Sequence, residues 1–174
     1  MKGLTEVLGA RLFGVSGMNV YAVLDGASIP SLLETLHREE PEHECLYRGE
    51  LPPDLAETAP YLVRLERGAG FSDWVLEQGW GNHWGIFALS GADLRTVRKH
   101  FRTFLIVHEE DGKPLYFRYY DPRVLRSYLP TCNSQELGTV FGPVACYVAE
   151  GAEPGVLLKY QLAKGALVER QEKL

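Results

Sequence analysis

The chain has 174 residues, of which 45% are hydrophobic and 24% are charged. These values are ordinary for a globular protein with one core, and they exclude a chain that is disordered throughout. The net charge of −5 argues against a general nucleic-acid binder, which would carry a basic excess. No apolar run approaches the roughly 18–20 residues of a membrane helix. Residues 1–10 lack the ordered regions of a signal peptide, so we expect a cytoplasmic protein with neither nucleic acid nor membrane as its partner.

In the first half of the chain, strand and helix patterns alternate. An apolar run at 20–24, ended by Asp25-Gly26, predicts a buried strand and a turn. A helix follows, capped by Ser28 or Ser31. Further patterns predict strands at 45–47, 61–65 and 84–89, a helix at 71–78 with its cap near Ser72, and a helix that starts at Ser90 or Asp93.

The second half contains the clearest local signal, a β-hairpin. Two apolar runs, 104–107 and 115–119, flank a turn at Asp111-Gly112. Asp121-Pro122 then predicts an N-cap and the first residue of a short helix. A weaker helix at 135–141 and strands at 144–149, 156–162 and 167–169 complete the chain.

Together these elements predict an α/β fold with a single mixed sheet and helices packed on it. The early part consists of βα units, and the late part is an antiparallel hairpin and meander. We expect one domain over residues 1–174, since the chain has no linker and is too short for two cores.

Charge is segregated along the chain. Residues 34–57, which overlap a predicted proline-rich loop at 39–60, carry eight acidic and two basic residues. Residues 95–126 carry eight basic and four acidic residues. Two interpretations stay open: the segments face each other or are simply solvated, or the basic segment forms a surface for an acidic partner.

Motifs of catalysis are missing from the sequence. It has no phosphate-binding loop, dinucleotide fingerprint, nucleophile elbow or H-E-x-x-H. Its three cysteines, Cys45, Cys132 and Cys146, are odd in number and form no C-x-x-C, which favours free thiols in a reducing cytosol. We therefore expect no enzyme activity, no metal and no cofactor. A small hydrolase with a cryptic Cys–His site is an alternative.

The segment Phe117-Arg-Tyr-Tyr-Asp-Pro-Arg123 is the most distinctive cluster of polar and aromatic residues. On a continued strand, Arg118 and Tyr120 would share one face, and Phe117 and Tyr119 the core face. Asp121 lies between two arginines, so an ion pair that holds the strand-to-helix corner is one interpretation. The other is a recognition surface, because Tyr and Arg are enriched in binding hot spots.

An ordered series of such segments resembles the domain of bacterial type VI secretion adaptor proteins, also called effector chaperones. The resemblance covers about residues 20–146, and 147–174 would be a short C-terminal extension of strands. The segments that carry it are Tyr21-Ala-Val-Leu-Asp-Gly-Ala, Tyr61-Leu-Val-Arg-Leu, Trp84-Gly-Ile-Phe-Ala-Leu-Ser, Phe104-Leu-Ile-Val, Asp111-Gly-Lys-Pro-Leu-Tyr-Phe-Arg-Tyr-Tyr-Asp-Pro-Arg-Val-Leu and Phe141-Gly-Pro-Val.

The resemblance implies a non-enzymatic protein that binds a toxic effector and helps load it onto the VgrG spike. It also implies candidate partner-binding residues at Asp25, Arg118, Tyr120, Asp121 and Arg123. We expect this chain to lack the longer C-terminal region of many members, which would be a place for effector selectivity. A second alternative is an immunity protein that blocks a toxin through the acidic segment 34–57.

Overall fold

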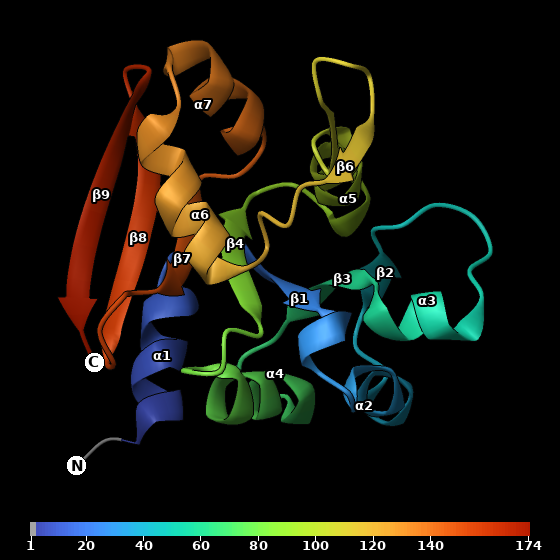
Figure 1. The fold of residues 1–174 in the computed structure, drawn as a ribbon. Coiled ribbons are helices and arrows are strands. Elements are labelled where there is room, and N and C mark those ends of the chain that lie inside the picture. The colour runs from blue at the N-terminus through green and yellow to red at the C-terminus, as the bar shows by residue number, and fades with distance from the viewer. Residues whose placement is uncertain (1–2) are drawn as a thin grey trace.

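A computed structural model describes residues 3–174 of the chain, and a seven-stranded sheet is its centre. The strand order is β2-β3-β1-β4-β7-β8-β9, and every pairing in it is antiparallel. A separate two-stranded sheet, β5-β6, stands outside it (Figure 1). The strands are β1 (Asn19–Asp25), β2 (His43–Cys45), β3 (Pro60–Leu65), β4 (Gly85–Ser90), β5 (Ile106–His108), β6 (Pro114–Tyr116), β7 (Cys146–Glu150), β8 (Val156–Ala163) and β9 (Ala166–Lys173).

Helices cover both faces of the main sheet and make a three-layer molecule. In Figure 1, α5, α6 and α7 lie above the sheet, and α1, α2 and α4 lie below it. The α-helices are α1 (Leu4–Leu12), α2 (Leu32–Glu39), α3 (Pro53–Thr58), α4 (Gly70–Trp74), α5 (Leu94–Thr103), α6 (Pro122–Tyr128) and α7 (Ser134–Phe141). Two 3-10 helices, η1 (Gly26–Ser28) and η3 (Leu129–Thr131), and one π-helix, η2 (Val75–Gly79), extend or join them. No helix within residues 3–174 is both long enough and apolar enough to cross a membrane.

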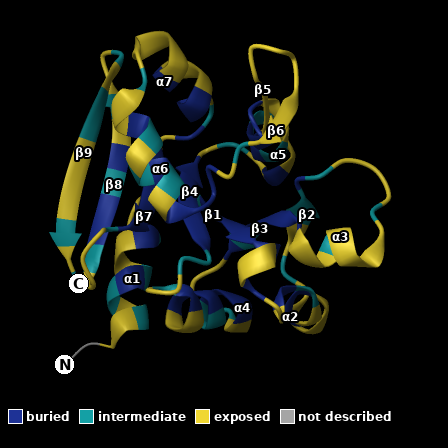
Figure 2. Ribbon diagram, in the orientation of Figure 1, coloured by how far each residue is buried: buried dark blue, intermediate teal, exposed yellow. Residues whose placement is uncertain are grey.

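The strands alternate between two cores, because successive side chains point to opposite faces of a sheet. Tyr21 and Val23 of β1 belong to the core under α5–α7, whereas Val20 and Ala22 belong to the core over α1, α2 and α4. Every residue of β4 is buried. Figure 2 accordingly shows the central strands buried and the outer sides of the helices exposed.

Aromatic side chains fill the core above the sheet. Phe101 of α5 is fully buried and stacks on Tyr119, with ring centroids 5.5 Å apart. Phe104 and Tyr147 complete the group around Phe101. The backbone after α5 and the segment after the hairpin are thereby joined through one cluster of rings.

The expected α/β class is confirmed, with helices on one main sheet and a meander at the end of the chain. The early strands also pair antiparallel, so no parallel pair occurs in the described residues. Asp93 and Asp121 cap α5 and α6 as expected. Several details differ. The sequence patterns did not predict α1, β2 lies at His43–Cys45 rather than 45–47, and Ser31 precedes α2 without a side-chain capping bond. In addition, α4 begins after Ala69 rather than near Ser72, the predicted loop at 39–60 contains α3, and β6 ends at Tyr116.

His100 provides a test of the packing between α5 and α7. Its ring lies against Phe101 and Phe104, with centroids 5.3 and 5.1 Å away, and Nε2 lies 2.8 Å from the carbonyl oxygen of Val140. A Cβ at Gly142 would meet this ring at 2.5 Å, and Gly142 has φ +46°, so both space and backbone require glycine. Burial lowers the pKa of His100 below its ordinary 6.5, although the bond to Val140 opposes the shift.

Because the folded pKa lies below the unfolded one, protonation of His100 favours the unfolded chain. We expect the free energy of unfolding to fall as the pH drops below about 6.5, and the fall to be smaller in His100→Gln. Urea unfolding of both proteins from pH 7.5 to pH 5 measures this difference. An identical pH dependence in the two proteins would contradict the prediction.

Candidate partner-binding surface

The cluster identified in the sequence is built on an ion pair between distant segments. Asp25, at the end of β1, binds Arg118, which is 93 positions further along the chain. The Asp25 carboxylate also accepts the Ala27 amide at 3.2 Å and the Ser28 hydroxyl at 2.8 Å, which caps η1. Asp25 is 1% exposed, whereas the Arg118 side chain is 47% exposed. Burial disfavours the Arg118 cation, but the hydrogen bond that Arg118 donates to the Asp25 carboxylate outweighs it and raises the pKa of Arg118.

A second pair begins α6. Asp121 accepts the Arg123 amide at 2.9 Å, and the Arg123 guanidinium binds both of its carboxylate oxygens, at 3.0 and 2.7 Å. Burial opposes ionisation of Asp121, yet the bonds from Arg123 prevail and lower the pKa of this carboxyl. The pair therefore acts both as helix cap and as charge partner.

The structure brings all five sequence-predicted residues together at this corner, but it exposes only some of them. Asp25, Tyr120 and Asp121 are buried, whereas the guanidinium groups of Arg118 and Arg123 reach the surface. The expectation that Arg118 and Tyr120 share a strand face is wrong, because the strand ends at Tyr116. Burial raises the pKa of Tyr120, whose hydroxyl interacts with that of Tyr47. The carboxylates hold the corner, and a partner can reach only the arginines.

The β5–β6 hairpin presents an apolar surface that the sequence did not reveal. Cross-strand pairs share a face, so Ile106 and Tyr116 point one way and Val107 and Leu115 the other. All four are exposed, Ile106 by 45% and Tyr116 by 58%. Only the base of the hairpin is anchored in the core, where Phe117 packs edge-to-face on Tyr128 with centroids 4.7 Å apart. An isolated two-stranded hairpin is at best marginally stable in water. A partner that covers these apolar side chains would therefore stabilise the hairpin.

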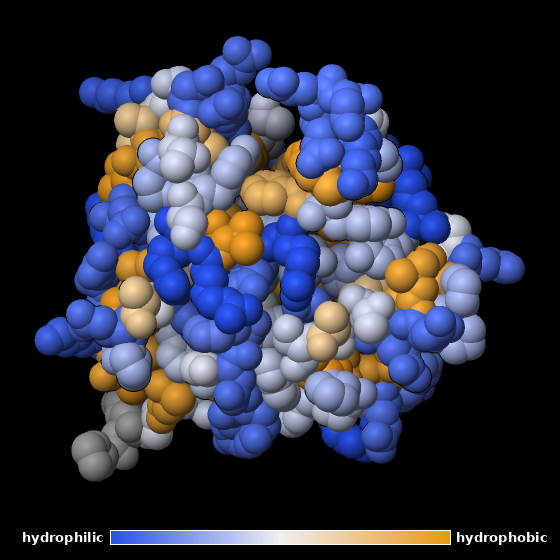
Figure 3. Space-filling view, viewed as in Figure 1, coloured by the Kyte–Doolittle hydropathy of each residue, from blue (hydrophilic) through white to orange (hydrophobic). Residues whose placement is uncertain are grey.

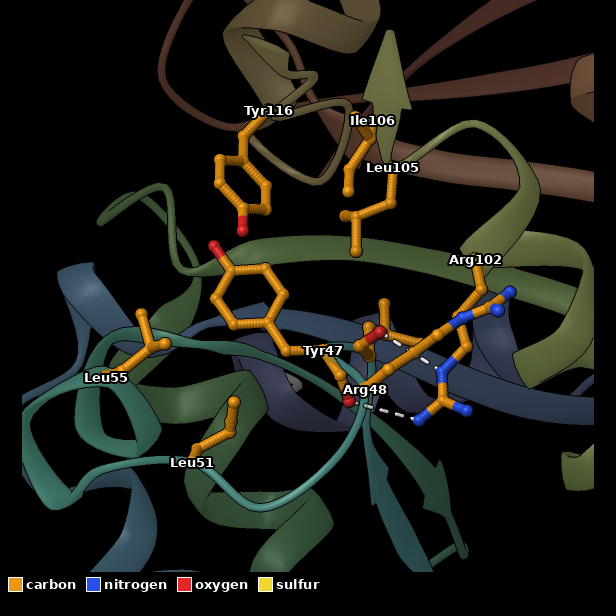
Figure 4. Close-up of a pocket in the computed structure, with 9 residues that line it drawn as sticks. Tyr47, Arg48, Leu51, Leu55, Arg102, Leu105, Ile106 and Tyr116 are labelled. Atoms are coloured by element: carbon orange, nitrogen blue, oxygen red, sulfur yellow. Dashed lines mark hydrogen bonds between the residues drawn. The ribbon is translucent and has the colours of Figure 1, made fainter. Parts of the chain in front are cut away.

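A cavity of about 290 Å³ lies between this hairpin and the segment before α3. In Figure 4, Tyr47 and Tyr116 point toward one another across it, and their ring centroids are 5.0 Å apart. We call this cavity the hairpin groove, and the residues that line it are Leu46, Tyr47, Arg48, Leu51, Leu55, Arg102, Leu105, Ile106 and Tyr116. Its size is at the low end of the roughly 300–1,000 Å³ of small-molecule pockets, so it suits inserted side chains.

The space-filling view shows the face of the molecule that carries the hairpin. Figure 3 shows hydrophobic side chains near the base of the hairpin and beside α3, under a hydrophilic hairpin tip. Five of the seven large hydrophobic side chains that are exposed within residues 3–174 belong to this region; they are Leu55, Ile106, Val107, Leu115 and Tyr116. The two apolar runs predicted the hairpin itself, but the sequence did not indicate that their side chains are exposed.

The acidic and basic segments do face each other in part. Arg98 of α5 binds Glu44 of β2 at 2.8 Å. Glu42 of the acidic segment pairs with Arg64, and Glu39 pairs with its neighbour Arg38. The acidic segment is therefore partly neutralised by arginines of its own chain, which leaves less acidic surface for an immunity-type contact.

The cysteines and the buried Glu150, away from the corner, have surroundings that point to structural roles. Burial raises the pKa of the Cys45 and Cys132 thiols and that of Cys146 to about 11, whereas nucleophilic cysteines have a lowered pKa. Glu150 is buried, and its carboxylate lies 2.8 Å from His83 Nδ1 and accepts the His83 amide at 3.2 Å. This pair ties the loop before β4 to the end of β7. Within residues 3–174, no three His, Cys, Asp or Glu side chains gather in a way that could hold a metal ion.

The Asp25–Arg118 pair predicts a specific pattern of stability. Arg118→Ala leaves a buried carboxylate without its cation and should lower the free energy of unfolding by about 1–3 kcal/mol. Asp25→Asn/Arg118→Ala should lose less than the two single variants added together, since the pair is coupled. Arg123→Ala is the matched control, because Asp121 keeps its bond to the backbone amide, and it should lose clearly less stability than Arg118→Ala. Chemical denaturation measures all four, and equal losses for the two arginine variants would contradict the assignment.

The comparisons with known proteins identify one family. Residues 20–139 match the family described as "Domain of unknown function (DUF4123)". Neither the curated proteins nor the solved structures contain a match to this chain. The matched region covers more than half of the 174 residues and includes the corner cluster and the hairpin groove. This chain therefore belongs to the DUF4123 family.

Proposed function

We propose that this chain is a non-enzymatic cytoplasmic adaptor that binds a type VI secretion effector and helps load it onto the VgrG spike. The observation that carries the proposal is the hairpin groove with its exposed apolar hairpin. The resemblance of residues 20–146 to type VI adaptor proteins supplies the identity of the partner, and membership in the DUF4123 family agrees with it.

The chemistry of the surface suits reversible protein binding. Tyr47 and Tyr116 provide large aromatic contact area, and aromatic and arginine side chains dominate binding hot spots. Arg48 and Arg102 lie beside the apolar centre, and a polar rim next to an apolar centre is the usual anatomy of an interface that forms and separates. An adaptor must release its client at the spike, so a small apolar centre with a polar rim fits this role better than a wholly apolar face.

The proposal predicts that a charge in the hairpin groove abolishes capture of the effector. Tagged wild-type protein should retain an effector or a VgrG protein from its own cells, identified by mass spectrometry. Ile106→Asp should reduce that capture at least tenfold, because a desolvated carboxylate in an apolar contact is strongly unfavourable. Leu4→Asp is the matched control, since Leu4 is 43% exposed on α1, and it should leave capture unchanged.

Thermal melts should show that both variants are folded. Capture of neither an effector nor VgrG by wild-type protein would overturn the adaptor proposal. Loss of the gene separates the alternatives: secretion fails if the protein is an adaptor, whereas the producing cell is poisoned if it is an immunity protein. A captured effector that remains active also favours the adaptor.

A further inference from the structure

Both charged side chains that line the hairpin groove are arginines. Arg102, in the last turn of α5, donates from Nε to the carbonyl of Leu46 at 3.1 Å. Its Nη2 donates to the carbonyls of Cys45 and Tyr47, at 2.7 and 3.1 Å. Figure 4 shows the Arg48 side chain extending alongside Arg102 at one end of the groove. Arg102 thus holds residues 45–47 in place through hydrogen bonds to backbone carbonyls. These acceptors are neutral, so they do not cancel the charge of the guanidinium.

The lining of the groove carries two positive charges and no carboxylate. Arg98 is the third arginine, and its partner Glu44 supplies the nearby carboxylate. Among residues 3–174, Arg48 forms no ion pair. Burial lowers the pKa of Arg102, and the like charges of Arg98 and Arg48 lower it further. An anion at this end of the groove would relieve that repulsion.

We infer that the hairpin groove selects a protein segment in which an acidic residue lies beside large apolar side chains. The carboxylate binds Arg48 and Arg102, and the apolar side chains pack in the groove against the contacting rings of Tyr47 and Tyr116. This inference rests on the proposed function, because it names the chemistry that the client offers to the same surface.

The extent of the apolar surface favours a protein segment over a small anion. Val107 and Leu115 lie on the opposite face of the hairpin from Ile106 and Tyr116, outside the lining of the groove. A ligand confined to the groove would leave that second apolar face in water. A polypeptide that wraps the hairpin covers both faces and still places one carboxylate at the arginines.

The test is a selection of random 15-residue peptides, displayed on phage, against the purified full-length chain. Peptides that combine Asp or Glu with Leu, Ile, Phe or Trp should be enriched. The best peptide is then synthesised with a fluorescent label, and its affinity is measured by anisotropy. Arg48→Glu, and Asp or Glu replaced by the amide in the peptide, should each weaken binding roughly tenfold, as expected for one charge-assisted contact.

Arg95→Glu is the matched control, because Arg95 is an exposed arginine of α5 that does not line the groove, and it should leave the affinity unchanged. Ile106→Asp should abolish binding and so locate the peptide. Enrichment of neutral or basic peptides, failure to enrich any peptide, or an affinity unaffected by Arg48→Glu would overturn the inference.

The two proposals fail in distinguishable ways. If Arg48→Glu captures a type VI effector from cells as well as wild-type protein does, the adaptor function holds. The inference that the client offers an acidic residue to the groove is then wrong. If acidic peptides bind through Arg48 but no effector or VgrG protein is captured, the inference holds and the adaptor function is wrong.

Discussion

The central strands of this protein carry apolar side chains on both faces, so neither face of the sheet can be left in water. Antiparallel sheets commonly leave one face solvated, with polar residues at alternate positions. Here β1 and β4 have almost no polar positions, and α5–α7 cover one face while α1, α2 and α4 cover the other. The helices that cover the sheet bury one face against it and expose the other. The three-layer architecture follows from this requirement.

The same constraint explains why the hairpin stands apart. β4 already pairs with β1 on one side and β7 on the other, so the chain leaving α5 finds no free place beside it. Residues 104–117 instead form an excursion that is anchored at its base by Phe104 and Phe117. Its apolar side chains cannot reach either core. The exposed surface is therefore a consequence of topology, and it is available to a second protein.

The corner cluster connects the excursion to the sheet. Arg118 follows the hairpin directly and binds Asp25, where β1 ends, and Asp121 then starts α6. At this end of β1, a Cβ on Gly26 would lie 2.4 Å from the carbonyl of Ala59, so the turn admits no side chain. Residues that resemble a binding motif thus position the hairpin beside the segment before α3. The proposed binding surface, the hairpin groove, lies next to these corner residues.

Local rules account for much of what the sequence by itself determined. Apolar runs located the strands of the main sheet, Asp93 and Asp121 marked helix starts, and Asp111-Gly112 marked a turn, which the structure closes with Gly112 at φ +84°. Each of these depends on residues within a few positions of one another. Four of the five corner residues were also found from the sequence, because they lie together at positions 118–123, whereas Asp25 came from the family resemblance. The burial of Asp25, Tyr120 and Asp121 was not predicted.

Only the tertiary structure decided which apolar residues are buried. Ile106 and Val107 have the same character as the residues of β4, but β4 lies between two layers of helices and the hairpin does not. Likewise, Arg48 and Arg102 belong to oppositely charged segments, and it is the packing of α5 against the residues after β2 that brings them together. Periodicity reports the chemistry of each position, whereas burial and the sharing of a cavity depend on neighbours distant in the chain.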